Sequence, residues 1–401
     1  MGRGDCLQFP LLSSRLNSFD IDMKHFLLAI ALFATSLFSF QAVAVPIPSP
    51  PQLNANSWIL MDFATGKVLS EHNADERIEP ASITKIMTSY VVYQAIDSGL
   101  ISMSDSVPVS EKAWRMKGSR MFIEVGKSVP LEALLKGLVI QSGNDAAVAL
   151  AEYVGGTEEA FAEQMNAAAK ALGMTGSHFV NSTGWPHADH YTTARDIAIL
   201  SHALIRDYPE HYRVYAEKNY TYNSIKQPNR NALLWRDSSV DGIKTGHTEA
   251  AGYCLAASAR RDDMRLISVV MGTESSGARS QYSQTLLNYG FRYYETRKLY
   301  AAGASLNAPR VWKGSIENLP IGPASDLYVT IPRGQYKNLK PSLDGVPNPL
   351  EAPVAKGTQL GTIRVKLGEE VVAEAPAVAL EQVDEGDFFS SAWDSILLMF
   401  E

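Results

Sequence analysis

The sequence predicts an α/β layered domain followed by a small all-β domain, and three features of the 401-residue chain support this prediction. Strand-like runs lie at both ends of residues 56–298, and apolar helical patterns lie between them. Near residue 300 the helical patterns give way to strand signals. Strands that flank a run of helices are typical of a layered α/β domain. With 46% hydrophobic residues, the chain is long enough to bury two cores.

The elements of the first domain follow from hydrophobic periodicity. A turn at 63–66 between two apolar runs predicts a β-hairpin near its start. The expected strands cover 57–62, 67–70, 252–259 and 264–271, and the expected helices cover 131–138, 146–153, 158–172 and 194–205.

Residues 299–384 are expected to form the all-β domain. One strand covers 327–331, and apolar residues alternate with polar ones over 362–367 before a turn at Gly368-Glu369 leads into another strand.

Residues 385–401 predict an amphipathic helix that lies on a membrane surface. One helical face collects Phe389, Trp393, Ile396, Leu397 and Phe400. The same face would equally suit docking on the β domain. The five acidic and no basic residues from Asp384 onward weaken attraction to anionic lipid.

Residues 1–44 read as a leader with a signal peptide. Met23-Lys24-His25 precedes an apolar run over 26–40 and the small-residue stretch Ala42-Val43-Ala44. We expect translation to start at Met23 and cleavage after Ala44, with 45–55 as a spacer and the mature protein exported. An uncleaved N-terminal anchor is the alternative.

Charge and cysteine content exclude several classes of function. The net charge is −7 and the pI is about 5.7, so no nucleic-acid partner is expected. The mature chain keeps only Cys254, so no internal disulfide forms. No metal or other cofactor is expected, because the histidines of residues 178–190 match no common ligand spacing.

The stretch around Ser82-x-x-Lys85 carries the main chemical signal. Pro80 suits a first helical turn, and a helix that begins there puts Ser82 and Lys85 on one face. A lysine that burial keeps neutral is able to remove the proton of a serine nucleophile. By itself S-x-x-K is frequent by chance, so further elements are needed.

Two further elements follow in fixed order, Ser142-Gly143-Asn144 and Lys244-Thr245-Gly246. Sixty residues separate the first serine from the second, and 102 separate the second serine from Lys244. Taken singly these tripeptides are an ordinary turn and an ordinary strand end. Their order and spacing resemble the signature of penicillin-binding proteins and serine β-lactamases.

Within that group, the neighbourhoods of the three elements closely resemble D-alanyl-D-alanine carboxypeptidases of the low-molecular-mass penicillin-binding protein 5 type. The resemblance runs from about Asn54 to the C-terminus. It implies a transpeptidase-like α/β (α+β) domain at 56–298, the β domain at 299–384 and the terminal helix. It also implies a peptidoglycan stem peptide ending in D-Ala-D-Ala as substrate, and covalent inhibition by β-lactams.

The resemblance assigns roles to four residues in the acyl transfer. Ser82 is the expected nucleophile, Lys85 its general base, and Ser142 the group that passes a proton to the leaving amine. The backbone N–H groups of Ser82 and His247 are expected to hold the oxyanion.

Five further residues are expected to bind substrate. Asn144 would fix Lys85 and the substrate amide, and Lys244 would keep the site electropositive. Thr245 and Arg230 would take the terminal carboxylate, which suits a guanidinium fork. Gly246 would leave room for a substrate laid along the strand.

Three other functions stay open for this sequence. A serine β-lactamase or a D,D-endopeptidase would share the fold, although an appended β domain favours the carboxypeptidase. A catalytically dead wall-binding scaffold would have no chemical need for all three elements.

Overall fold

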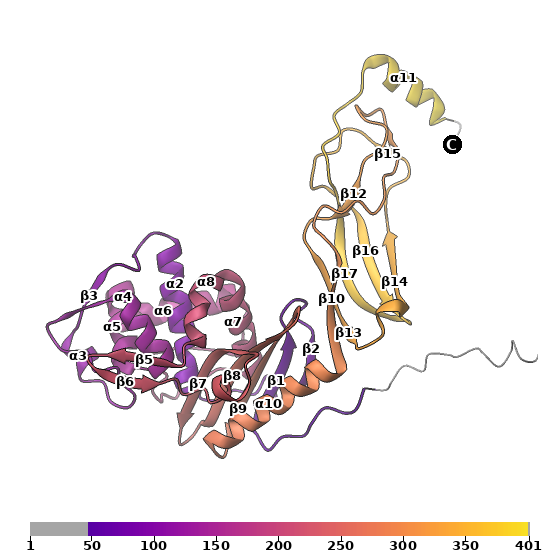
Figure 1. Cartoon of the computed structure of the whole chain (residues 1–401). Helices are drawn as coiled ribbons and strands as arrows, with labels where there is room; N and C mark the ends of the chain where they lie inside the picture. Colours follow the sequence, from indigo (N-terminus) through magenta and orange to yellow (C-terminus); the bar gives the residue numbers. More distant parts are fainter. Residues whose placement is uncertain (1–46, 400–401) are drawn as a thin grey trace, which may run out of the picture. The chain divides into compact units, whose positions relative to one another are not determined.

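The computed structural model describes residues 47–399 (Figure 1). The leader 1–44 lies outside the described residues, and with it the expected signal peptide and start at Met23; so does Phe400. Between residues 47 and 399, none of the helices combines the length and the hydropathy that a membrane crossing requires.

A five-stranded sheet frames the first domain. Its strands are β1 (Ser57–Asp62), β2 (Val68–His72), β7 (Val240–Thr248), β8 (Gly252–Arg261) and β9 (Met264–Thr273). They lie in the order β2-β1-β9-β8-β7, and every neighbouring pair is antiparallel. The expected hairpin at the start of the domain is β1-β2. β7 is an edge strand, so one of its sides is free of strand pairing.

Helices and short hairpins fill the chain between β2 and β7, and one long helix follows β9. The helices are α2 (Lys85–Asp97), α3 (Glu111–Trp114), α4 (Leu131–Lys136), α5 (Asn144–Gly155), α6 (Glu158–Ala171), α7 (Ala194–Asp207), α8 (Pro209–Tyr212), α9 (Leu233–Arg236) and α10 (Ser276–Tyr293). Shorter turns are η1 (Ala81–Thr84), η2 (Gly137–Gln141) and η3 (Arg213–Ala216), and the hairpins are β3 (Ser106–Pro108) with β4 (Ser128–Pro130) and β5 (Asn219–Tyr222) with β6 (Ile225–Pro228).

Hydroxyl side chains fix where the longer helices begin. Thr157 accepts a hydrogen bond from the third residue of α6, and Thr193 does the same for α7. Ser275 caps α10 in the same way. Each cap satisfies one of the backbone N–H groups that a helix start leaves unpaired. α6 and α7 lie within two residues of their predicted ranges.

The two faces of the sheet are covered by different helices. α10 packs against the face that carries Leu60 and Leu266, and a Cβ at Gly290 would lie only 2.5 Å from Leu266. Ile59 and Ile267 belong instead to the buried core that the sheet shares with α2, α5 and α7. This division follows from the alternation of side chains along a strand. The edge strand β7 is thereby held between helices on both sides of the sheet.

The second domain is all β up to a terminal helix. Its elements are β10 (Tyr294–Tyr300), β11 (Val311–Trp312), β12 (Ile321–Pro323), β13 (Leu327–Pro332), η4 (Tyr336–Asn338), β14 (Leu339–Asp344), β15 (Leu350–Glu351), β16 (Gln359–Leu367), β17 (Glu370–Ala379) and α11 (Phe388–Leu397). Four strands form a sheet in the order β12-β17-β16-β14, and the turn expected at Gly368-Glu369 joins β16 to β17. β10 pairs with β13, so strand structure begins at Tyr294 rather than at residue 299.

A buried carboxylate links the last residue of β1 to β10 and β13. Asp62 accepts hydrogen bonds from the hydroxyls of Thr296, at 2.6 Å, and Thr330, at 2.9 Å. Thr65 donates to the same carboxylate from its backbone and its side chain. A buried charge needs such donors to offset the loss of water, and this one obtains them from both domains.

Candidate active site

Ser82 lies in the 3-10 turn η1, and Lys85 is the first residue of α2. The sequence predicts an α-helix that begins at Pro80, whereas one 3-10 turn precedes α2. Side chains three residues apart eclipse one another in a 3-10 turn. The turn therefore brings the two side chains together, with Lys85 Nζ 3.0 Å from Ser82 Oγ.

The amine of Lys85 has three oxygen neighbours and is almost completely buried. Besides Ser82 Oγ, Nζ lies 2.7 Å from Asn144 Oδ1 and 2.6 Å from the Thr183 carbonyl. Only 1% of the Lys85 surface is exposed. A neutral amine has two N–H groups and one lone pair. Asn144 and Thr183 accept the two N–H groups, so the lone pair is left for the hydrogen of the Ser82 hydroxyl.

Burial also lowers the pKa of Lys85 to a value that lets its amine act as a base near neutral pH. The pKa of Lys85 is lowered to about 7, first by burial and then by the positive charge of Arg230. The carboxylates of Asp145 and Glu158 partly oppose this change. A pKa near 7 leaves about half of the amines neutral at pH 7, which suits general base catalysis.

The Ser142 element follows an irregular turn. η2 is a π-type turn that ends at Gln141, and the next residue, Ser142, has a left-handed φ of 66°. Such turns and strained backbones often mark functional sites. Asn144 then begins α5, and its Nδ2 donates to the Lys117 carbonyl, which fixes the amide with Oδ1 toward Lys85. The carboxylate of Asp145 accepts N–H groups from Met121 and Phe122.

The edge strand β7 brings a second amine into the site. Lys244 Nζ donates to Ser142 Oγ at 2.8 Å and to the Thr245 carbonyl at 3.1 Å. The pKa of Lys244 is lowered well below its ordinary value, first by burial and then by the charges of Lys85 and Arg230. Each of the two amines thus contacts one serine hydroxyl, Lys85 that of Ser82 and Lys244 that of Ser142.

Gly246 meets η1 rather than open space. A Cβ there would lie 3.0 Å from the Pro80 carbonyl and 3.2 Å from the Ile83 backbone nitrogen. Its lack of a side chain thus lets β7 approach the Ser82 turn closely, a reason that the sequence analysis did not foresee. The exposed His247 follows, and its ring packs 4.0 Å from that of Tyr253.

Ser82 lies where two hollows meet. The first, of about 820 Å³, is also lined by Ser142, Thr245 and Arg230. The second, of about 590 Å³, runs past Trp185 on the other side of Ser82. The first has the basic residues Lys226, Arg230, Arg236 and Arg279 and no carboxylate among the described residues that line it, whereas the second has Glu79 and Glu249.

Two contributors to this site escaped the sequence analysis. Arg279 of α10 is buried, and it donates to the Gly246 carbonyl at 3.0 Å while lining the basic hollow. It belongs to none of the three elements. Thr183 contributes only a backbone carbonyl, which any residue would supply, so no sequence signal marks it.

The histidines of residues 178–190 build structure. His190 accepts the Val180 N–H at Nδ1 and therefore donates from Nε2 to Thr84 Oγ1, 2.8 Å away. Burial lowers the pKa of His190 to about 4, which keeps the ring neutral. Within residues 47–399, no group of three or more His, Cys, Asp or Glu side chains is arranged to hold a metal ion.

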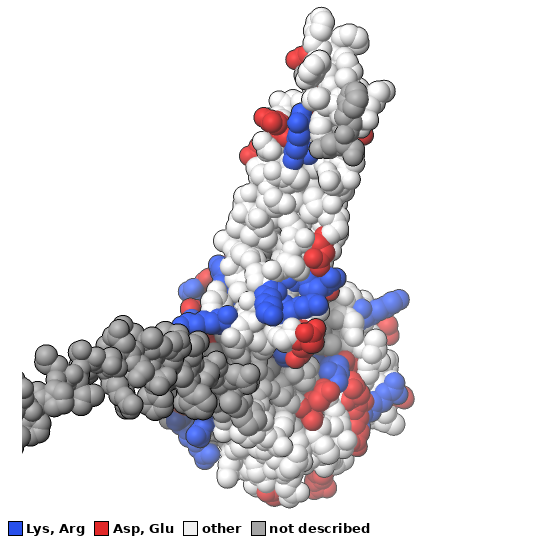
Figure 2. Space-filling model, turned by 90° about the vertical axis from the view of Figure 1, so that its right-hand side faces the viewer, with Lys and Arg blue, Asp and Glu red and all other residues white. Residues whose placement is uncertain are grey.

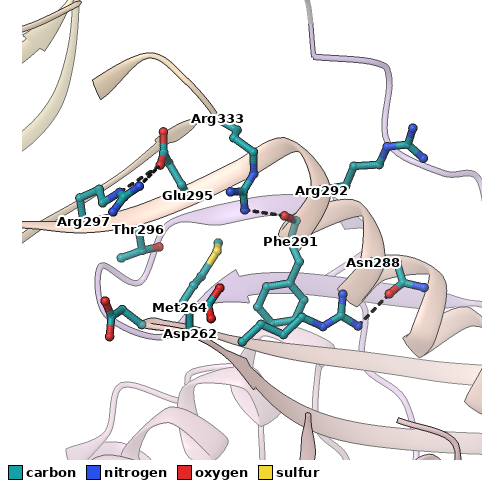
Figure 3. Close-up of a pocket in the computed structure, with 11 residues that line it drawn as sticks. Asp262, Met264, Asn288, Phe291, Arg292, Glu295, Thr296, Arg297 and Arg333 are labelled. Atoms are coloured by element: carbon teal, nitrogen blue, oxygen red, sulfur yellow. Dashed lines mark hydrogen bonds and ion pairs between the residues drawn. The ribbon is translucent and has the colours of Figure 1, made fainter. Parts of the chain in front are cut away.

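Another cavity, of about 580 Å³, lies where α10 gives way to β10 (Figure 3). Its polar groups largely satisfy one another. Arg333 donates to the Phe291 carbonyl at 2.8 Å, and Arg297 pairs with Glu295 at 3.0 Å. Its described lining contains no serine, cysteine or lysine, so it offers no nucleophile of the kind that Ser82 provides.

Family models match both domains of the chain. Residues 44–275 match the D-alanyl-D-alanine carboxypeptidase family, and residues 294–385 match the C-terminal domain of penicillin-binding protein 5. The second match begins at the start of β10, in agreement with the observed strand pairing.

Sequence and structural similarity to individual proteins supports the same family. The D-alanyl-D-alanine carboxypeptidase DacC of Escherichia coli is 45% identical over 376 residues, which cover 92% of this chain and 93% of that protein. The crystal structure of penicillin-binding protein 5 from Haemophilus influenzae superposes with a TM-score of 0.81 at 40% identity, over 84% of this chain and 100% of that one. An ampicillin-bound penicillin-binding protein from Listeria monocytogenes superposes with a TM-score of 0.56 at 29% identity, over 61% of this chain and 100% of that one.

The predicted fold class is therefore confirmed, with a penicillin-binding-protein-like α/β domain before an all-β domain. The first match alone spans more than half of the chain, and the relatives are covered almost completely. This chain belongs to the D-alanyl-D-alanine carboxypeptidase family of serine peptidases.

Proposed function

We propose that this protein is a serine-type D-Ala-D-Ala carboxypeptidase that removes the terminal D-alanine of peptidoglycan pentapeptides through an acyl-enzyme on Ser82. β-Lactams would acylate the same serine. The observation that carries the proposal is the buried Lys85 Nζ, which lies 3.0 Å from Ser82 Oγ and also contacts two further acceptors, Asn144 Oδ1 and the Thr183 carbonyl. In the neutral amine these two acceptors would take both N–H groups and leave the lone pair for the Ser82 hydroxyl.

Acylation begins with transfer of the Ser82 proton to Lys85 as Oγ attacks the carbonyl carbon of the penultimate residue. The carbonyl oxygen then carries negative charge. The backbone N–H groups of Ser82 and His247 are assigned to hold it, and both residues line the hollows that meet at the nucleophile. Loss of one oxyanion donor typically costs about 3 kcal/mol of transition-state stabilisation.

Collapse of the tetrahedral intermediate breaks the C–N bond and requires a proton on the departing amine. Ser142 is assigned to deliver it, because its hydroxyl accepts from Lys244 and lies in the same hollow as Ser82. D-Alanine leaves, and water then hydrolyses the ester on Ser82.

The basic hollow is assigned to the terminal carboxylate of the substrate. Thr245 and Arg230 would bind it, and Arg279 adds a buried positive charge. The basic lining suits a pentapeptide that ends in D-Ala-D-Ala, because its free terminal carboxylate lies next to the scissile bond. The contacts of Lys85 with Ser82 and of Lys244 with Ser142 argue against a catalytically dead scaffold.

We also propose a location for the protein, on the outer face of the inner membrane in the periplasm. Export would use the leader, and attachment would use α11. Asp394 ties this helix to the β domain, since it accepts from Arg310 at 2.9 Å and from the Lys313 N–H at 2.7 Å. Phe389 is 83% exposed and Trp393 62% exposed. The helix is thus docked through a polar side chain while its aromatic residues stay free to enter a lipid interface.

A nucleic-acid partner is not proposed. The face of the molecule in Figure 2 carries acidic and basic side chains interspersed. A nucleic-acid-binding surface would carry a patch of clustered lysine and arginine side chains.

The function is tested by D-alanine release from a pentapeptide that ends in D-Ala-D-Ala. We expect release by the wild type and a loss of at least about 10³-fold in Ser82→Ala, because the nucleophile is gone. Pretreatment with penicillin should abolish release by the wild type. Rapid turnover of penicillin would instead favour the β-lactamase, and a stable adduct on Ser82 without any release would favour the endopeptidase or the scaffold.

The carboxylate assignment predicts the behaviour of Arg230→Gln. The KM for the pentapeptide should rise about tenfold, as expected for loss of one charge-assisted hydrogen bond. The assay is run near pH 9, well above the pKa of about 7 of Lys85, so that loss of the Arg230 charge alters the protonation of Lys85 less than it would at pH 7. Lys226→Gln removes a charge from the same hollow and serves as the control. Equal effects of both variants, or an equal effect on a substrate with a C-terminal amide, would contradict a specific role for Arg230.

The membrane assignment predicts co-sedimentation of the protein with liposomes. Deletion of residues 387–401 should abolish pelleting, and the double substitution Phe389→Ser with Trp393→Ser should reduce it at least tenfold, because aromatic area is lost from the interface. Asp394→Ala, which keeps the apolar residues, should still pellet. Equal pelleting of the full and truncated proteins would exclude the anchor.

A further inference from the structure

A tight loop at residues 181–185 lies against the Ser82 turn. Its Thr183 carbonyl accepts from Lys85 Nζ at 2.6 Å, and its Ser182 carbonyl accepts from Thr88 Oγ1 at 2.6 Å. A Cβ on Gly184 would lie 1.7 Å from the Ala81 carbonyl oxygen, so the loop and η1 are in direct backbone contact. The position of the base therefore depends on the shape of this loop.

One side chain determines that shape. Asn181 Oδ1 accepts four hydrogen bonds from the next residues: the Thr183 N–H at 3.1 Å, the Thr183 hydroxyl at 3.0 Å, the Gly184 N–H at 2.8 Å and the Trp185 N–H at 3.0 Å. Asn181 Nδ2 donates to the Trp185 carbonyl at 2.9 Å. Side-chain bonds of this kind replace those that a regular turn would make.

We infer that Asn181 is a positioning residue for the reaction: its amide oxygen folds the 181–185 loop so that the Thr183 carbonyl holds the Lys85 amine with its lone pair toward Ser82. This inference rests on the proposed function, in which Lys85 is the base. Asn181 itself is absent from the linings of both hollows at Ser82, so it acts through Thr183 and not on substrate.

Glu158 of α6 also holds the loop, through Ser182, a residue to which Asn181 makes no hydrogen bond. Glu158 accepts from both the backbone N–H and the hydroxyl of Ser182, at 3.0 and 2.7 Å. This contact fixes where the loop attaches to α6. Thr183 follows Ser182 in the chain, and its backbone N–H and hydroxyl donate to Asn181 instead. Loss of the Asn181 oxygen would thus release Thr183 while the loop stays attached.

The charged environment of Lys85 decides the sign of the expected pH effect. Arg230, Lys244 and His190 face it as basic groups, and Asp145 and Glu158 as acidic ones. Burial is nevertheless the largest cause of its lowered pKa. A loosened loop admits water and weakens that cause, so the pKa of Lys85 should rise. Because only the neutral amine accepts a proton, the rate of acylation should then reach its half-maximum at a higher pH.

The test measures the second-order rate constant for acylation by a fluorescent penicillin as a function of pH. In Asn181→Leu, which has a similar volume and no acceptor, we expect a fall of about 100-fold at pH 7, the effect of a misplaced catalytic group. Its half-maximum should move upward by about one pH unit. Asn181→Asp keeps the acceptor oxygen although it loses the Nδ2 donor. Its rate constant for acylation should therefore stay within about tenfold of the wild-type value.

Asn166→Leu is the matched control. Asn166 makes two hydrogen bonds to the backbone of Phe179, just before the loop, and none to residues 181–185. The Asn166→Leu substitution should lower thermal stability without moving the pH of half-maximal acylation. If Asn181→Leu does not fold, Asn181→Ser replaces it, since a shorter hydroxyl reaches fewer of the four donors and should give an intermediate shift.

The inference is overturned if the Asn181→Leu or Asn181→Ser protein matches the wild type in rate and pH of half-maximum, or if it behaves as Asn166→Leu does. Failure of the wild type itself to be acylated at Ser82 would instead refute the proposed function, so the two failures are distinguishable.

Discussion

The hydrogen bonds of one buried amine set the requirements that the rest of the site meets. Lys85 Nζ contacts Asn144, Thr183 and Ser82 within 3.0 Å, and only the neutral amine makes all three contacts with the serine hydroxyl as donor. To supply these partners, a 3-10 turn, the start of α5 and the 181–185 loop must meet at one point. The helical core beneath α2 and the close approach of β7 hold that meeting point in place. Much of the α/β domain can be understood as the support for this contact.

Positive charge around the amine has two consequences. Together with burial, the charge of Arg230 disfavours protonation of Lys85, which makes the amine a base near neutral pH. The same charge, with that of Arg279, prepares the adjoining hollow for an anionic group. Arg230 thus contributes both to the lowered pKa of Lys85 and, with Arg279, to the positive charge of the adjoining hollow. A carboxylate in the lining would weaken both effects, and the described residues of that hollow include none.

The sequence predicted the parts of this arrangement that depend on side-chain patterns. The β1-β2 hairpin, helices α6 and α7 and the turn between β16 and β17 follow from hydrophobic periodicity and turn residues. The three motif elements could be joined because their order and spacing are specific. Contributions from the backbone could not be predicted: the Thr183 carbonyl has no sequence signal, and no residue pattern at Ser82 distinguishes a tighter 3-10 turn from the first turn of an α-helix. Arg279 was missed because it reaches Gly246 from 33 residues further along the chain.

The protonation state of Lys85 is the central claim, and NMR measures it directly. Protein with ¹³C-labelled lysine is titrated, and the Lys85 side-chain signal is assigned by its loss in Lys85→Arg. Titration with a midpoint near pH 7 would agree with burial beside Arg230 as the cause of the lowered pKa. Titration near the ordinary lysine value of about 10.4 would leave the amine protonated at neutral pH and contradict its role as the base.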